Sequence, residues 1–154
     1  MKIIVLSDSH NRFTFSEFLP IAQSADTVIH LGDGFRDIQD LKSILTCPFY
    51  YVSGNCDYSN IYEQTIEIEN NKIFITHGHN YDVKYSLSRL KQKAQKESAN
   101  IVLYGHTHIP DITFQDNIWL INPGSLCLPR EDKKPTYCIL TLTGGKIYPQ
   151  LMEF

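Results

Sequence analysis

The sequence predicts an α/β fold, in one domain that spans residues 1–154. Short apolar runs alternate with helical patterns over the first two thirds of the chain, and hairpin patterns fill the last third. Unbroken runs rich in Val, Ile and Leu are typical of strands that are covered on both faces. A chain of 154 residues is also long enough to bury a sizeable core.

The first elements follow from apolar periodicity. Strands are predicted over residues 2–6, 27–31 and 49–52. Residues 13–24 carry a helical stripe of apolar side chains, in which Pro20 either opens the regular part of the helix or kinks it. Residues 37–45 are predicted to form a short helix with Asp37 as its N-cap.

The remaining chain combines one more helix with three hairpins. Residues 83–97 have a helical pattern, and a solvated basic face explains their charges better than an anion site does. That face contains Lys84, Arg89, Lys91, Lys93 and Lys96. The hairpins pair residues 65–68 with 73–76, 112–114 with 118–121, and 136–142 with 146–151. A buried strand is predicted over residues 101–104, and a loop over residues 128–135.

Charge and composition exclude several classes of protein. The net charge of −3 and pI of about 6.0 argue against long nucleic acid as the main partner, because phosphate neutralisation needs a basic face. No apolar run approaches the ~20 residues of a membrane span, and the N-terminus is unlike a signal peptide. The four cysteines form no C-x-x-C pair, which favours a reducing, cytoplasmic location.

Polar side chains stand at the ends of five predicted strands. His106 and His108 follow one strand with a single residue between them, and Asp8 and His10 follow another with the same spacing. In an extended chain such pairs share a side. Each segment alone also has a purely structural explanation. Asp8 could cap a helix, and Gly32-Asp33-Gly34 and Asn55 could each belong to a turn. His30 lies inside a strand and is interpreted as a core or supporting histidine.

Together these side chains predict a metal centre, because strand ends in an α/β sheet collect ligands at the carboxyl edge. The candidate ligands are Asp8, His10, Asp33, Asn55, His77, His106 and His108. Seven ligands exceed the needs of one tetrahedral ion and suit two divalent ions about 3.5–4 Å apart with a bridging carboxylate. A mixed nitrogen and oxygen set without thiolate suits Mn²⁺ first, with Ni²⁺, Co²⁺, Fe²⁺ or Zn²⁺ as alternatives, and argues against Ca²⁺.

The same segments carry a family resemblance. They are Asp8-Ser9-His10, Gly32-Asp33, Gly54-Asn55-Cys56-Asp57, His77-Gly78-His79 and Gly105-His106-Thr107-His108. This series resembles the five signatures of the calcineurin-like metallophosphoesterases, and its spacing is similar to that of their small, single-domain prokaryotic phosphodiesterases. The resemblance covers residues 1–125, including the turn at Asn122-Pro123-Gly124-Ser125. It implies a four-layer αββα sandwich of two mixed sheets flanked by helices, with a dinuclear metal site at the strand ends.

The resemblance also implies roles for the ligands. Asp8, His10 and His108 would bind the first metal. Asn55, His77 and His106 would bind the second. Asp33 would bridge the two, and Asn55 would also touch the substrate phosphate. The implied reaction is hydrolysis of a phosphate ester by a hydroxide activated between the metals, without a covalent phosphoenzyme.

Cys56 is a departure from many relatives, which have a histidine there that is thought to act as general acid. A thiol with a pKa of about 8.5 is a poorer proton donor to an alkoxide, although the small prokaryotic subgroup resembles this chain in having cysteine. Modest turnover or a preference for good leaving groups would follow. Asp57 is expected to orient a ligand, and His79 either reaches the substrate or has a structural role.

Three functions compete at this stage. The first is a phosphodiesterase for small phosphate esters, because no segment reads as a lid or an added substrate domain. The second is a catalytically weak scaffold, since a retromer subunit with this fold has a degraded site and works through surface contacts. The third is a phosphomonoesterase or nuclease. Specificity would lie in residues 11–15, 58–63 and 128–135. A homodimer is possible through Tyr81, Tyr85 or Trp119.

Overall fold

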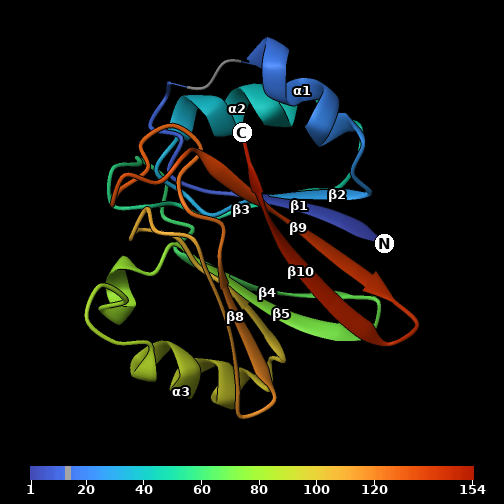
Figure 1. Ribbon diagram of the computed structural model, residues 1–154, viewed down its shortest axis with the longest axis vertical. Coiled ribbons are helices and arrows are strands. Elements are labelled where there is room, and N and C mark those ends of the chain that lie inside the picture. Colours follow the sequence, from blue (N-terminus) through green and yellow to red (C-terminus); the bar gives the residue numbers. More distant parts are fainter. Residues whose placement is uncertain (13–14) are drawn as a thin grey trace.

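Two five-stranded sheets lie face to face between helices in the computed structural model, which describes residues 1–12 and 15–154 (Figure 1). Helices α1 (Phe15–Gln23) and α2 (Phe35–Ile44) cover the outer face of one sheet. Helix α3 (Ser88–Glu97) covers the outer face of the other. The expected four-layer αββα sandwich of two mixed sheets is confirmed.

Both sheets mix parallel and antiparallel pairs. The first has the order β10 (Lys146–Glu153), β9 (Thr136–Thr143), β1 (Lys2–Leu6), β2 (Thr27–His30), β3 (Phe49–Tyr51). The second has the order β4 (Glu63–Ile68), β5 (Asn71–Thr76), β6 (Ile101–Leu103), β8 (Ile118–Asn122), β7 (Asp111–Gln115). β1, β2 and β3 are parallel, as are β5, β6 and β8. The five strands that precede the candidate ligands therefore belong to parallel sets, three in one sheet and two in the other.

β1 shows why the central strands read as unbroken apolar runs. Ile3 and Val5 point into the core between the sheets, where they pack with residues of both. Ile4 and Leu6 point the other way, into the layer under α1 and α2. All four side chains are fully buried. Each contributes about 1.5–3 kcal/mol relative to exposure, so β1 is a rigid base for the residues that follow it.

Two helix starts differ from the prediction. α2 begins at Phe35 with Gly34 as its N-cap, so Asp37 is a buried first-turn residue and its assignment as N-cap is wrong. α3 begins at Ser88, not at residue 83. Residues 79–81 form a short 3-10 helix (η1, His79–Tyr81). The chain then makes a separate turn, in which the Tyr85 and Ser86 backbone N–H groups donate to the Asp82 carbonyl, and α3 starts only after this turn with Leu87 as its N-cap. The predicted helix start at residues 13 and 14 lies outside the described residues.

All three predicted hairpins form. Each has a two-residue turn with positive φ at both positions, the geometry that matches the twist of the flanking strands. The turns are Glu69-Asn70, Asp116-Asn117 and Gly144-Gly145. The last third is not simply antiparallel, however. β8 pairs parallel with β6, and β9 pairs antiparallel with β1, so the last two hairpins extend different sheets.

The aromatic residues considered for a dimer face are mostly engaged within the chain. Tyr81 packs edge-on against Phe74 and donates a hydrogen bond to Glu63. Trp119 stacks against Phe114 and packs on the core between the sheets. Only Tyr85 of the three is strongly exposed, at 90%.

No helix within the described ranges is long and apolar enough to cross a bilayer.

Candidate metal centre

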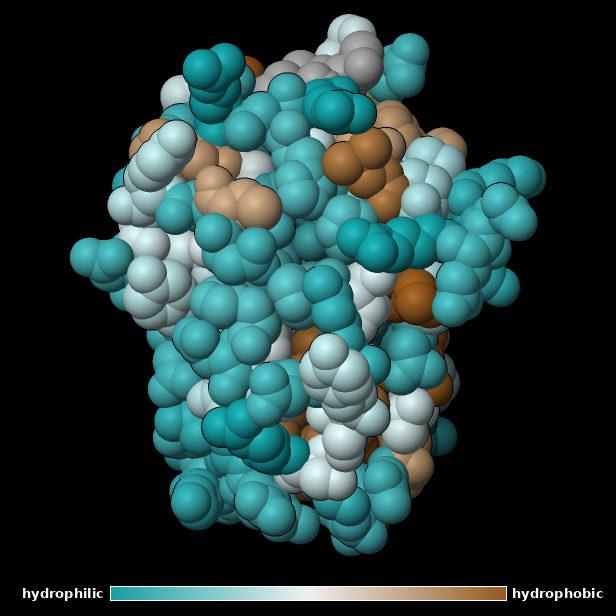
Figure 2. All heavy atoms as spheres, turned by 90° about the vertical axis from the view of Figure 1, so that its left-hand side faces the viewer, coloured by the Kyte–Doolittle hydropathy of each residue, from teal (hydrophilic) through white to brown (hydrophobic). Residues whose placement is uncertain are grey.

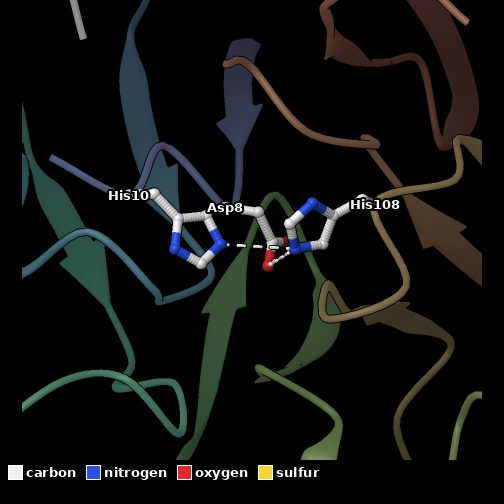
Figure 3. A group of neighbouring side chains, drawn as sticks. All are labelled: Asp8, His10 and His108. Carbon is white, nitrogen blue, oxygen red and sulfur yellow. Dashed lines mark hydrogen bonds and ion pairs between the residues drawn. The ribbon is translucent and has the colours of Figure 1, made fainter. Parts of the chain in front are cut away.

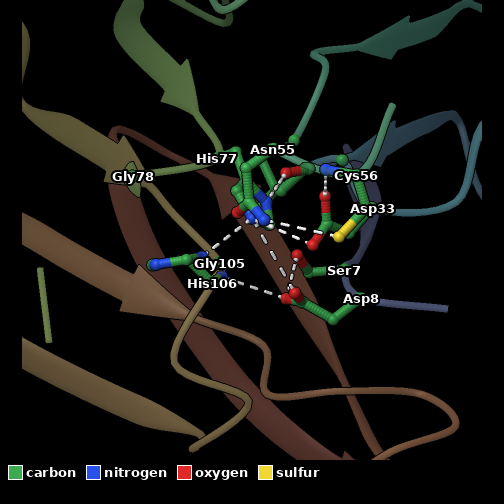
Figure 4. Close-up of polar contacts among 12 residues, drawn as sticks. Ser7, Asp8, Asp33, Asn55, Cys56, His77, Gly78, Gly105 and His106 are labelled. Carbon is green, nitrogen blue, oxygen red and sulfur yellow. Dashed lines mark hydrogen bonds and ion pairs between the residues drawn. The ribbon is translucent and has the colours of Figure 1, made fainter. Parts of the chain in front are cut away.

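The predicted ligands converge between the two sheets, at the ends of five strands. Asp8 and His10 follow β1, Asp33 follows β2, and Asn55 follows β3. His77 follows β5, and His106 and His108 follow β6, so the site joins edges of two sheets. Figure 4 shows side chains of both sheets pointing toward one another. The molecular face on the left of Figure 1 is largely hydrophilic, with separate hydrophobic patches (Figure 2).

One group consists of Asp8, His10 and His108 (Figure 3). Nε2 of His108 lies 3.2 Å from Oδ1 of Asp8 and 3.3 Å from Nε2 of His10. The other carboxylate oxygen of Asp8 accepts hydrogen bonds from the Ser7 hydroxyl and the His106 backbone N–H. Oδ1 of Asp8 is buried without a hydrogen-bond partner, so it is the free ligand atom of this group.

A second group consists of Asp33, His77 and His106. Nε2 of His77 lies 3.5 Å from Oδ2 of Asp33 and 3.2 Å from Nδ1 of His106. Oδ1 of Asp33 accepts a hydrogen bond from the Cys56 backbone N–H, which leaves Oδ2 facing the ring nitrogens. The same oxygen lies 3.8 Å from Nε2 of His10, so Asp33 stands between the two groups.

Hydrogen bonds to backbone carbonyls orient the rings of His77 and His108 so that each Nε2 atom faces the site. Nδ1 of His77 donates to the Leu31 carbonyl at 2.8 Å, and Nδ1 of His108 donates to the Leu128 carbonyl at 2.6 Å. When these rings are neutral, both Nε2 atoms therefore carry lone pairs that face carboxylate oxygens. An imidazole lone pair and a carboxylate that face each other repel unless positive charge lies between them. The donor set thus fits divalent cations, and carbonyl-oriented imidazoles are the usual metal ligands.

The contact between Asp8 and His108 favours positive charge at this pair. Burial raises the pKa of Asp8, but the contact with His108 and the charge of His77 outweigh it and lower that pKa to about 2. The close contact with the Asp8 carboxylate in turn raises the pKa of His108. Burial lowers the pKa of His106 to about 4, with help from His77 and Lys84, so this ring stays neutral and able to bind a metal at pH 7.

The backbone at the ligands is left-handed, which differs from the extended geometry used to predict them. Five of the seven candidates have positive φ: Asp8, His10, Asp33, His106 and His108. Because the chain is not extended there, His106 and His108 do not share a side. His106 joins His77, whereas His108 joins Asp8 and His10. Strained φ values outside glycine concentrate at functional sites.

Close approach of the loops explains two glycines. A Cβ on Gly105 would lie 2.0 Å from the Ser7 hydroxyl oxygen and 2.9 Å from Oδ2 of Asp8. A Cβ on Gly54 would lie 1.9 Å from Oδ1 of Asp33. These glycines let the strand ends come within bonding distance of the carboxylates. At Gly105 the lack of a side chain serves contact with the loop after β1.

Asp57 holds the loop after β2 against the loop after β3. Its Oδ2 accepts hydrogen bonds from the backbone N–H groups of Asp33 and Gly54, at 2.7 and 2.8 Å. Its Oδ1 accepts one from Gly34 at 2.9 Å. The Asp57 carboxylate therefore fixes the backbone that carries Asp33.

Asn55, Cys56 and His79 occupy different places around the centre. Asn55 and Cys56 line the site cavity beside His10 and Asp33, and the Cys56 sulfur is close enough to both to share a metal position. Burial and the neighbouring Asp33 raise the pKa of the Cys56 thiol to about 11. Among the residues that line this cavity His79 is absent. Its ring instead packs on His77, with centroids 5.4 Å apart.

Residues 1–145 match the family model of the calcineurin-like phosphoesterase superfamily domain. The chain belongs to the calcineurin-like phosphoesterase superfamily. It is therefore a phosphoric ester hydrolase, in agreement with the resemblance found in its five strand-end segments.

Several relatives support the superfamily assignment. The probable metallophosphoesterase YsnB of Bacillus subtilis is 32% identical over 148 residues, covering 92% of this chain and 85% of YsnB. Phosphodiesterase MJ0936 of Methanocaldococcus jannaschii is 27% identical, covering 82% of this chain and 85% of MJ0936. The crystal structure of a predicted phosphoesterase from Streptococcus pneumoniae TIGR4 has a TM-score of 0.85 at 28% identity, covering 99% of this chain and 88% of that chain. Zn²⁺-complexed Vps29 of Entamoeba histolytica has a TM-score of 0.80 at 18% identity, covering 99% of each chain, and shares the fold.

Sequence reasoning missed four residues that surround the centre of this phosphoesterase. Lys84 was interpreted as part of a solvated helix face, but it lies in the turn before α3 and lines the site cavity together with Arg130. The Asn122 side chain donates to the Gly105 carbonyl, and the Ser125 hydroxyl donates to the Asp8 carbonyl. The turn pattern at residues 122–125 hinted at the last two, and the expected specificity segment at residues 128–135 contains Arg130. Nothing in the sequence placed Lys84 at the site.

Proposed function

We propose that this chain is a cytoplasmic phosphodiesterase that acts on small phosphate esters with two divalent metals, of which Mn²⁺ is the first choice. The observation that carries the proposal is Oδ1 of Asp8, a buried carboxylate oxygen without a hydrogen-bond partner, on which the possible ligand atoms of His10, His77, His108 and Asp33 converge. Named phosphodiesterases among the relatives support the substrate class. Four free cysteines agree with a reducing compartment.

The residues are assigned to two metal positions. Asp8, His10 and His108 would hold the first ion. Asn55, His77 and His106 would hold the second. Asp33 would bridge them, because its Oδ2 faces a histidine of each group. When bound, two such ions supply a hydroxide nucleophile near neutral pH and draw charge from the phosphoryl oxygens.

The remaining side chains orient these groups and handle the leaving group. Asp57 keeps Asp33 in place through backbone hydrogen bonds. The amide of Asn55, on the cavity wall, is positioned to contact the substrate phosphate. The Cys56 thiol stays protonated but is a weak acid, so we expect faster hydrolysis of esters whose leaving groups need no proton. For His79 we propose a supporting role behind His77.

The test is hydrolysis of bis(p-nitrophenyl) phosphate by metal-stripped protein with and without Mn²⁺. We expect activity only with metal, loss of activity in Asp33→Ala, and unchanged activity in the control Asp40→Ala, whose carboxylate is exposed on α2. Calorimetry should show two ions per wild-type chain. Full activity without metal or in Asp33→Ala would refute the mechanism.

A catalytically weak scaffold is the second candidate, because Vps29 shares the fold and the Cys56 thiol is a poor proton donor. That function predicts two bound metals with no turnover of diester or monoester. Faster hydrolysis of p-nitrophenyl phosphate than of the diester would instead identify a phosphomonoesterase.

A further inference from the structure

A second cavity adjoins the metal centre. The cavity over the metal ligands is lined in part by His10, Asp33, Lys84, His106 and Arg130. The neighbouring cavity has a volume of about 540 Å³. It is lined by Lys84, Thr107, Ile109, Arg130 and Glu131. Lys84 and Arg130 therefore stand on the boundary, where each faces both the ligands and the additional space.

These two cations differ from three of the basic residues of α3 in their ion pairing. Within residues 1–12 and 15–154, neither Lys84 nor Arg130 forms an ion pair, whereas Arg89, Lys91 and Lys93 all do. Among the described residues, the boundary thus holds two positive charges without an ion-pair partner.

The backbone places both residues beside the site, with their side chains exposed. Lys84 follows the buried Val83, in a turn closed by hydrogen bonds from the Tyr85 and Ser86 backbone N–H groups to the Asp82 carbonyl. Arg130 follows Leu128, whose carbonyl accepts the hydrogen bond from Nδ1 of His108. The cations are therefore part of the same scaffold as the ligands, which distinguishes them from lysines on a freely solvated helix face.

We propose that this phosphoesterase prefers diesters in which one substituent carries a second anionic group, which Lys84 and Arg130 bind while the esterified phosphate lies at the metal centre. The inference rests on the proposed function and specifies its substrate class. Ile109 supplies an apolar wall for the carbon skeleton between the two anions. Glu131 carries the opposite charge, so it limits the affinity of the cavity for anions.

Two chromogenic esters that differ only in one phosphate provide the test. Thymidine 5′-(p-nitrophenyl phosphate) is compared with its 3′-phosphorylated form, at low ionic strength because exposed charges are screened by salt. We expect kcat/KM to be about tenfold higher for the 3′-phosphorylated ester. Lys84→Ala and Arg130→Ala should each reduce that preference several-fold and together abolish it. Glu131→Gln should increase it, and Lys133→Ala, on the same loop but outside both cavities, should leave it unchanged.

Binding provides a readout that does not depend on turnover. Metal-loaded protein is titrated calorimetrically with thymidine 5′-phosphate and with thymidine 3′,5′-bisphosphate, and the ratio of their Kd values should follow the same pattern across the variants. Tighter bisphosphate binding without hydrolysis of either ester would refute the proposed function and leave the anion site standing. Hydrolysis of both esters at equal kcat/KM, with equal Kd values, would refute the anion site and leave the proposed function standing.

Discussion

Replacing Asp57 with Asn measures how strongly the loops after β2 and β3 depend on one carboxylate. Three backbone N–H groups donate to Asp57, at 2.7, 2.8 and 2.9 Å. An Asn side chain keeps a single acceptor oxygen, so at least one N–H group would face an NH₂ donor. Loss of one charge-assisted hydrogen bond costs about 1.5–3 kcal/mol, and the remaining bonds lose their ionic partner. We expect Asp57→Asn to lower the free energy of unfolding by about 3 kcal/mol.

Urea unfolding of the metal-free protein measures this loss directly. Asp40→Asn changes an exposed carboxylate on α2 and should shift the free energy of unfolding by less than about 0.5 kcal/mol. Metal affinity should fall by about 10–100-fold in Asp57→Asn, because the loop that carries Asp33 is no longer fixed. Equal urea midpoints and equal metal affinity in wild type and Asp57→Asn would show that these hydrogen bonds do not hold the site.

Two further predictions concern buried contacts. Nδ1 of His30 accepts the Gly32 backbone N–H, and burial lowers the pKa of this ring to about 4 from an ordinary 6.5. The unfolded chain therefore binds the proton first, and about 3 kcal/mol of stability should be lost as the pH falls from 6.5 to 4. Urea unfolding across this range should show a shallower pH dependence in His30→Asn; an unchanged slope would rule out this assignment. Gly105→Ala places a Cβ 2.0 Å from the Ser7 hydroxyl and should cost about 1–3 kcal/mol in thermal or urea unfolding. The double variant with Ser7→Ala should recover part of that loss, and strict additivity would contradict the proposed clash.

The strands were predictable because their periodicity is local, whereas the ends of helices and the partners of strands are not. β1 reads as a buried strand from five consecutive residues. By contrast, α3 begins late because the residues after Asp82 form a separate turn, which the helical spacing of the apolar residues does not reveal. The pairing of β9 with β1 joins residues more than 130 positions apart, and hairpin patterns carry no information about such a contact.

The ligand types at the site were predictable, but their geometry was not. Each candidate follows a strand, so strand recognition was enough to bring Asp8, Asp33 and His77 to the same region. The assumption of an extended chain then placed His106 and His108 on one side, although both have positive φ and face different groups. Lys84 and Arg130 reach the cavity from a turn and a loop, and only the tertiary fold brings them together.

The strain at the ligands links stability to metal binding. Five candidate ligand residues have a left-handed backbone, at a cost of about 1 kcal/mol or more each. Their summed cost is comparable with a typical net free energy of unfolding of about 5–15 kcal/mol. Hydrogen bonds from Ser125 and to Asp57 hold this backbone in place from outside the ligand set. A cation that satisfies Oδ1 of Asp8 and the facing ring nitrogens would add about 4 kcal/mol at a thousandfold excess over its Kd. The strained strand ends are therefore best explained as a conformation that the core imposes and that the bound metals stabilise further.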